Sequence, residues 1–117
     1  MKLNAAIVPA GQWGTALAVP LARGGHRVRL YFRSDEEAAR FNAHRENAKR
    51  LPGVIFPGNV SATGDLAAAV QDADLVVVAP SSGGLRDVCR QLRPILPRKA
   101  VVVSVVKAMF SQEPRLP

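Results

Sequence analysis

The sequence has one cysteine, Cys89, among its 117 residues, and its hydrophobic runs are short. A single cysteine excludes an intramolecular disulfide framework and any metal site built from clustered cysteines. We expect Cys89 to pack as a small apolar residue on its helix. No apolar stretch approaches the roughly 20 residues that span a bilayer, and the run at residues 5–8 is too brief for a signal-peptide core. These absences predict a cytoplasmic protein with no membrane partner.

Acidic residues are also scarce, because 9 Asp and Glu stand against 16 Lys and Arg, for a net charge of +7. The positive excess favours anionic partners, a class that includes nucleic acids, phosphorylated metabolites and dinucleotides. The basic residues are spread over predicted turns and helices, and no nucleic-acid-binding motif is present. We therefore expect neither a nucleic-acid partner nor a metal site.

The length predicts one domain over residues 1–117, with enough core to bury about two-thirds of the unfolded surface. Apolar or alternating segments predict strands at residues 3–8, 27–32, 60–62, 75–79 and 101–106. Segments with helical patterns lie at residues 15–23, 34–48, 65–71 and 85–92. Strands that alternate with helices indicate βαβ units. The predicted class is α/β, with a doubly wound, mostly parallel sheet of about five strands.

The start of the second helix carries a capping box from Ser34 to Glu37. In this motif the serine hydroxyl accepts a hydrogen bond from the amide three residues later, and the glutamate reaches back to the serine amide. The acids also lie at the positive end of the helix dipole. This explanation accounts for Asp35, to which we assign no role in binding.

The turn after the first strand is the most informative segment for function. Residues 9–14 match G-x-G-x-x-G at its second and third glycines, Gly11 and Gly14, while Pro9 replaces the first. The middle glycine lets the backbone approach a pyrophosphate, the last permits close packing of helix on sheet, and the following helix amides hold the phosphates. A tight turn without a ligand is the alternative. The strand before the turn and the helix after it favour dinucleotide binding.

The second strand ends at Arg33, 19 residues after Gly14. Folds that prefer NAD place an acidic residue near this point, whereas a basic residue suits the 2′-phosphate of NADP. Arg33 therefore predicts that NADP(H) is preferred over NAD(H). The alternative is a solvated surface arginine.

From about residue 7 to residue 107, the sequence resembles the bacterial NAD(P)-dependent glycerol-3-phosphate dehydrogenases. The matching segments lie, in order, at residues 11–18 (GQWGTALA), 21–26, 45–47, 51–53 (LPG), 62–66, 73–79, 85–86 and 104–107. The resemblance implies a Rossmann domain followed by a helical substrate domain, which is absent from this chain. It also implies reduction of dihydroxyacetone phosphate to sn-glycerol 3-phosphate.

The same resemblance implies roles for individual residues. Gln12 and Trp13 fall where the family contacts the dinucleotide, and Arg33 falls where it reads the adenosine ribose. Arg50 occupies a cofactor-contacting position that often holds tyrosine. Lys107 matches a lysine that touches cofactor and substrate, which makes it the candidate catalytic residue. The implied partners are a dinucleotide and either sn-glycerol 3-phosphate or dihydroxyacetone phosphate.

The family's second catalytic lysine and its substrate-binding residues lie beyond residue 117. We therefore expect the chain to be the cofactor-binding part of such an oxidoreductase, not catalytically complete alone. The alternative is a stand-alone, non-catalytic nucleotide-binding or regulatory module. The apolar strand predicted at residues 101–106 would present a flat face and unpaired backbone groups at a sheet edge. We therefore expect a homodimer or higher assembly, or an exchanged C-terminal segment.

Overall fold

The computed structural model describes residues 2–80 and 84–105. Its elements follow one another in strict alternation along the chain. They are β1 (Asn4–Val8), α1 (Gln12–Arg23), β2 (Arg27–Tyr31), α2 (Asp35–His44), β3 (Val60–Thr63), α3 (Leu66–Val70), β4 (Leu75–Val78), α4 (Leu85–Leu92) and β5 (Val101–Ser104). Each predicted strand and helix is present within a few residues of its expected bounds. The last residue of the predicted fifth strand, Val106, lies outside the described residues.

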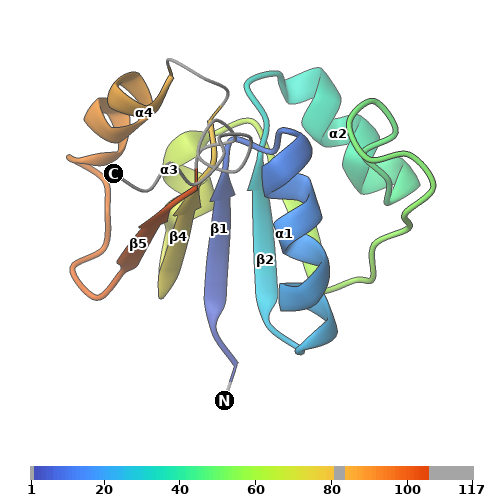
Figure 1. The fold of residues 1–117 in the computed structure, drawn as a ribbon, viewed down its shortest axis with the longest axis horizontal. Helices are drawn as coiled ribbons and strands as arrows, with labels where there is room; N and C mark the ends of the chain where they lie inside the picture. The colour runs from blue at the N-terminus through green and yellow to red at the C-terminus, as the bar shows by residue number, and fades with distance from the viewer. Residues whose placement is uncertain (1, 81–83, 106–117) are drawn as a thin grey trace, which may run out of the picture.

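The five described strands form one sheet in the order β3-β2-β1-β4-β5, and every neighbouring pair is parallel (Figure 1). The chain builds outward from β1 to β3 on one side, then crosses back to place β4 and β5 on the other. This confirms the predicted Rossmann-type α/β fold. In such sheets, ligands bind at the carboxyl ends of the strands where the order reverses, which here is between β1 and β4.

Helices cover both faces of the sheet. On one face α1 and α2 pack on a core that includes Ile7, Leu30 and Phe41. On the other face, α3 and α4 pack on a core that includes Val76 and Val88. The strand register explains this division, since Ile7 lies opposite both Leu30 and Val77, and side chains alternate between the two faces along each strand.

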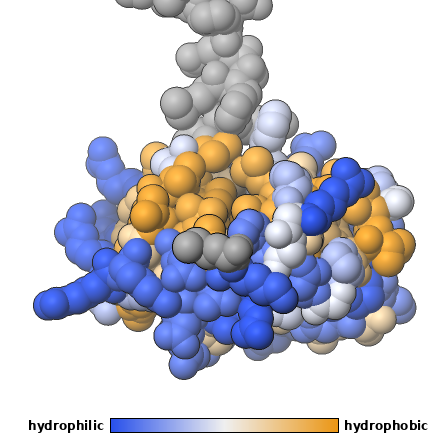
Figure 2. All heavy atoms as spheres, turned by 90° about the horizontal axis from the view of Figure 1, so that it is seen from below, coloured by the Kyte–Doolittle hydropathy of each residue, from blue (hydrophilic) through white to orange (hydrophobic). Residues whose placement is uncertain are grey.

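The edge strand β5 is poorly covered. Val101, Val102 and Val103 are 62%, 44% and 41% exposed. Figure 2, viewed from the end at which the strands begin, shows hydrophobic surface on the side where Figure 1 places β5. The predicted apolar strand is therefore at a sheet edge, as expected.

Two local predictions are wrong. Helix α2 ends at His44 and not near Ala48, because Arg45 turns to the left-handed region at φ 60°. The Arg45 guanidinium then donates to the carbonyls of Phe56, Pro57 and Val60, so hydrogen bonds to the end of the following loop and the start of β3 replace the next helical turn.

The expectation that Cys89 packs as an apolar residue is also wrong, because its side chain is exposed. On α4 the buried face is formed by Val88 and Leu92, which lie one helical turn apart. Cys89 follows Val88 by one position and so projects away from that face.

No helix within the described ranges is long and apolar enough to cross a membrane.

Candidate functional site

A pocket of about 360 Å³ lies at the carboxyl ends of β1, β2 and β4. Its walls are residues 9–12 of the turn after β1, residues 31–33 at the end of β2, Ala79 after β4, and the side chains of Glu37 and Arg50. Four of the residues selected from the sequence, Gly11, Gln12, Arg33 and Arg50, therefore line one pocket. It occupies the position where an open parallel sheet places its ligand.

The two glycines of the turn, Gly11 and Gly14, have different surroundings. A Cβ atom on Gly14 would lie 2.6 Å from Cγ2 of Ile7 and 2.7 Å from the carbonyl oxygen of Pro9, so this position must be glycine for α1 to pack on β1. A Cβ atom on Gly11 would meet no atom within 4 Å. Gly14 thus serves packing, whereas Gly11 leaves the pocket open beside the backbone.

The start of α1 is suited to an anion. Its N-cap residue is Gly11, which provides no side-chain cap, and the first turn carries no acidic residue. By contrast, α2 is capped by Ser34 and α3 by Asp65. Because the N-terminal end of a helix carries partial positive charge, this end of α1 can receive a phosphate without competition from a capping side chain.

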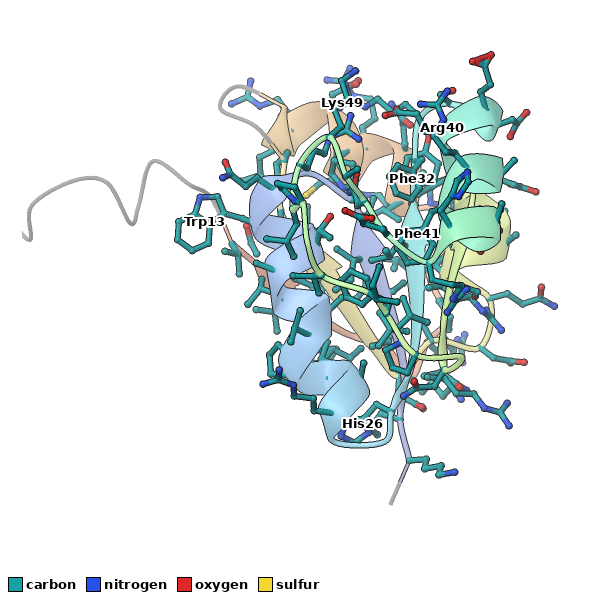
Figure 3. All side chains as sticks on the ribbon, turned by 90° about the vertical axis from the view of Figure 1, so that its right-hand side faces the viewer. Trp13, His26, Phe32, Arg40, Phe41 and Lys49 are labelled. Carbon is teal, nitrogen blue, oxygen red and sulfur yellow. The ribbon has the colours of Figure 1, made fainter. Side chains whose placement is uncertain are left out.

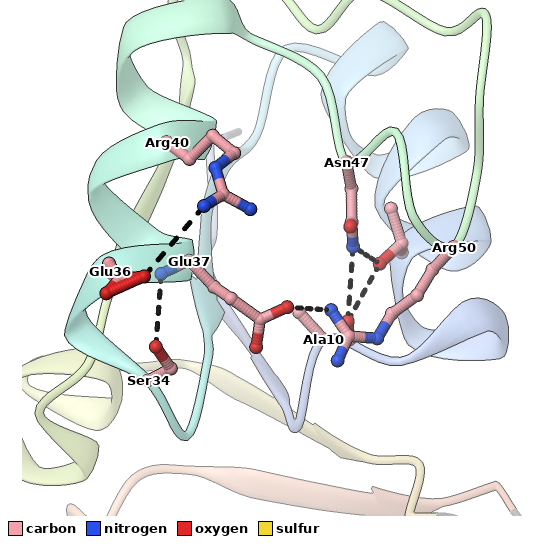
Figure 4. Close-up of polar contacts among 8 residues, drawn as sticks. Ala10, Ser34, Glu36, Glu37, Arg40, Asn47 and Arg50 are labelled. Atoms are coloured by element: carbon pink, nitrogen blue, oxygen red, sulfur yellow. Dashed lines mark hydrogen bonds and ion pairs between the residues drawn. The ribbon is translucent and has the colours of Figure 1, made fainter.

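A buried hydrogen-bond network holds the glycine turn in place (Figure 4). The Thr15 hydroxyl donates to the carbonyl of Ala10 at 3.2 Å. The Asn47 side-chain amide donates to Thr15 Oγ1 at 2.8 Å and to the same carbonyl at 3.2 Å. The amide of Ala10 donates to the Tyr31 carbonyl at the end of β2. Asn47 was not selected from the sequence; its only signal was its place in a segment that matches the family.

An ion pair forms one wall of the pocket. Arg50 Nη1 lies 2.8 Å from Glu37 Oε2, and the guanidinium lies over the ring of Phe32 at 5.9 Å from the centroid. The hydrogen bond from Arg50 holds the pKa of the Glu37 carboxyl below its ordinary value.

Half of the predicted capping box is present. The Ser34 hydroxyl accepts from the Glu37 amide at 3.2 Å. The Glu37 carboxylate, however, pairs with Arg50 and does not reach back to Ser34, so the reciprocal half of that prediction is wrong. Because the capping explanation accounted for Glu37, sequence reasoning missed its place in the pocket.

Three other residues selected from the sequence are Arg33, Trp13 and Lys107. Arg33 is exposed, and no hydrogen bond or ion pair within residues 2–80 and 84–105 involves it. Trp13 lies at the N-terminal end of α1 and is not among the pocket walls (Figure 3). Lys107 lies outside the described residues, so its catalytic role stays a prediction.

A second cavity, of about 620 Å³, adjoins the first between α2 and the segment that follows it. Its walls include Phe41, Arg40 and Lys49, and it shares Phe32 and Glu37 with the smaller pocket (Figure 3). Glu37 thus borders both cavities, whereas Arg50 lines the smaller one. Among the described residues, no group of three or more His, Cys, Asp or Glu side chains could hold a metal ion.

Comparison with known proteins agrees with this geometry. Residues 4–116 match the family described as NAD-dependent glycerol-3-phosphate dehydrogenase N-terminus. The chain belongs to this family. Glycerol-3-phosphate dehydrogenase [NAD(P)+] from Symbiobacterium thermophilum is 46% identical over 107 residues, which cover 92% of this chain and 30% of the relative. Its counterpart from Moorella thermoacetica is 45% identical, with 93% of this chain and 32% of the relative covered.

Solved structures of related enzymes share the fold of this chain. Glycerol-3-phosphate dehydrogenase from Coxiella burnetii superposes with a TM-score of 0.83 at 31% identity, over 91% of this chain and 33% of the other. A ketopantoate reductase family protein from Ralstonia eutropha superposes with a TM-score of 0.70 at 27% identity, over 89% of this chain and 34% of the other. This chain thus spans about a third of the length of these relatives.

Proposed function

We propose that this domain binds a nicotinamide dinucleotide in the pocket between Gly11 and Arg33, with NADP(H) preferred over NAD(H). The observation that carries the proposal is the meeting, in one pocket, of the uncapped start of α1 and the arginine that follows β2. The pocket fits such a ligand, because Gly11 leaves the backbone accessible and the first turn of α1 carries no competing carboxylate.

Each wall of the pocket would contact a different part of the dinucleotide. The turn at Gly11 and Gln12 would hold the pyrophosphate, while Arg33 and Arg50 would lie toward the adenosine ribose. The network of Thr15 and Asn47 fixes the turn before the ligand arrives, which reduces the entropy lost on binding.

The wider activity that we propose is the reduction of dihydroxyacetone phosphate to sn-glycerol 3-phosphate by the enzyme to which this domain contributes. The reduced nicotinamide of a bound dinucleotide would supply the hydride for such a reduction and would leave oxidised. Lys107 is the residue that we propose as proton donor to the carbonyl oxygen.

The test measures the affinity of the chain for NADPH and NADH by calorimetry, in the parent and in Arg33→Asp. A charge-assisted contact to the 2′-phosphate contributes about 1.5–3 kcal/mol, so NADPH should bind roughly tenfold to a hundredfold more tightly. Arg33→Asp should narrow or reverse that preference. Arg27→Asp, at the other end of β2, is the matched control and should leave it unchanged. Equal affinity of the parent for both cofactors would contradict the NADP preference.

We further propose that the domain forms a homodimer through β5. In the described part of the chain β5 pairs with β4 only, so its outer edge and its exposed valines can receive a strand from a second copy. Light scattering over a dilution series should show a dimer at about 100 μM, and Val102→Lys should shift the mass toward the monomer. The control is Ile55→Lys, which changes another exposed hydrophobic residue, 66% exposed, away from the edge. A monomer mass for the parent at that concentration contradicts the dimer.

A further inference from the structure

The two arginines of the pocket differ in their partners. Arg33 takes part in no hydrogen bond or ion pair within the described residues, whereas Arg50 is bonded to Glu37 at 2.8 Å. Arg50 is further held by its position over Phe32. One guanidinium is therefore available to a ligand, and the other is already occupied by a carboxylate.

The first turn of α2 directs Glu37 into the pocket and Glu36 away from it (Figure 4). The Glu37 side chain is 24% exposed, whereas that of Glu36 is 84% exposed and lies 3.9 Å from Arg40, away from the walls of the smaller pocket. The Ser34 hydroxyl caps this turn by accepting a hydrogen bond from the Glu37 backbone amide, and Arg50 holds the Glu37 carboxylate. Two neighbouring carboxylates on one helix thus differ mainly in whether they face the ligand pocket.

Glu37 is the only acidic residue among the described walls of this pocket, beside Arg33 and Arg50. Its bond to Arg50 lowers the pKa of the carboxyl, so the group is charged at neutral pH. A charged carboxylate repels a phosphate dianion but accepts hydrogen bonds from neutral ribose hydroxyls. The pocket therefore contains one group that opposes a 2′-phosphate and two that favour it.

We propose that Glu37 is a specificity-determining residue that limits the preference for a 2′-phosphate, by occupying Arg50 and by repelling the phosphate. This inference rests on the proposed dinucleotide site and adds a second determinant to Arg33. The two act in opposite directions, so Glu37 narrows the preference for NADP(H) over NAD(H) that Arg33 by itself would give.

The test compares Glu37→Gln with the parent in calorimetric titrations of NADPH and NADH. Adenosine 2′,5′-bisphosphate and 5′-AMP, which differ only by the 2′-phosphate, isolate the adenosine end. Removing the carboxylate charge should tighten binding of NADPH and of adenosine 2′,5′-bisphosphate by roughly fivefold. The affinities for NADH and 5′-AMP, which lack the 2′-phosphate, should change by less than about twofold. Glu36→Gln removes the same charge from the same turn outside the pocket, and should leave all four affinities at parent values.

A second variant covers the case in which Glu37→Gln does not fold. Arg50→Gln leaves Glu37 charged and unpaired in the pocket, and should lower affinity for NADPH more than affinity for NADH. Equal shifts for ligands with and without the 2′-phosphate in either variant, or weaker NADPH binding in Glu37→Gln, would overturn the inference while leaving the dinucleotide site intact. A parent chain that binds neither dinucleotide would contradict the proposed function itself, and the inference with it.

Discussion

The side-chain amide of Asn47 donates to the hydroxyl of Thr15 across 2.8 Å, linking two residues 32 positions apart. Thr15 is fully buried and Asn47 nearly so. Both side chains also bond the carbonyl of Ala10, inside the glycine turn. The turn that forms the candidate phosphate site is thus tied to the segment that carries Arg50. Buried polar groups of this kind are costly to leave unpaired, so the contact contributes to stability as well as to the shape of the pocket.

Asn47→Ala should lower the free energy of unfolding by about 1–3 kcal/mol, because it removes two buried hydrogen bonds. Thr15→Val, which keeps the shape of the side chain, should have a comparable cost. Urea denaturation of both single variants and the double variant measures the coupling. We expect the double variant to lose about 1 kcal/mol less than the sum of the single losses. Strict additivity would show that the two side chains do not act together.

The two glycines of the turn should separate stability from binding. Gly14→Ala should destabilise the domain by about 1–3 kcal/mol, since its Cβ would overlap Ile7 and the Pro9 carbonyl. Gly11→Ala is its matched control in the same turn. It should keep stability within about 1 kcal/mol, because the new methyl meets open space.

Gly11 lines the pocket where we propose that the pyrophosphate binds, so a methyl group there should hinder its approach. We expect the NADPH affinity of Gly11→Ala to fall at least about tenfold, or ~1.4 kcal/mol. Thermal unfolding and calorimetric titration on the same samples distinguish the two effects. A Gly11→Ala variant that binds like the parent would place the phosphate elsewhere.

Acid should weaken the fold through Asp74, which joins three segments. Its carboxylate accepts the Asn4 amide at 2.8 Å and pairs with Lys99 at 3.1 Å. The hydrogen bond from Asn4 and that from Lys99 lower its pKa from the ordinary 3.8. As the pH falls, the carboxyl of Asp74 is therefore protonated in the unfolded chain before it is protonated in the folded one. The stability that the ionised carboxylate contributes is complete well above pH 3.8 and is lost as the pH falls below that value.

Asp74→Asn measures this contribution, since it cannot ionise. The variant should be less stable than the parent at neutral pH, and the difference should narrow as the pH falls below the ordinary pKa of 3.8. Urea unfolding midpoints at a series of pH values provide the comparison. Two curves that stay parallel down to acid would show that the carboxylate charge adds nothing to the folded state.

Much of the architecture follows from local patterns in the sequence. Apolar runs at β1 and β4 and the alternation in β2 indicate strands buried on one or both faces, and each is followed by a helix. Alternating strands and helices require crossover connections, which make the sheet parallel. The turn at Gly11 and Gly14 and the position of Arg33 then place the candidate site at the carboxyl ends of the strands, where the pocket lies.

Tertiary structure decided the features that depend on partners distant in sequence. Glu37 fits a local capping box by its spacing from Ser34, but its carboxylate binds Arg50, which only folding brings near. Helix α2 ends early, and Arg45 instead donates to three carbonyls at residues 56, 57 and 60, more than ten positions away. Local periodicity reports what a segment prefers by itself, and it is silent about hydrogen bonds to other segments. The sequence by itself therefore determined the order of the elements and the location of the pocket, while the packing of α2 against the segment after it decided which charges face the ligand.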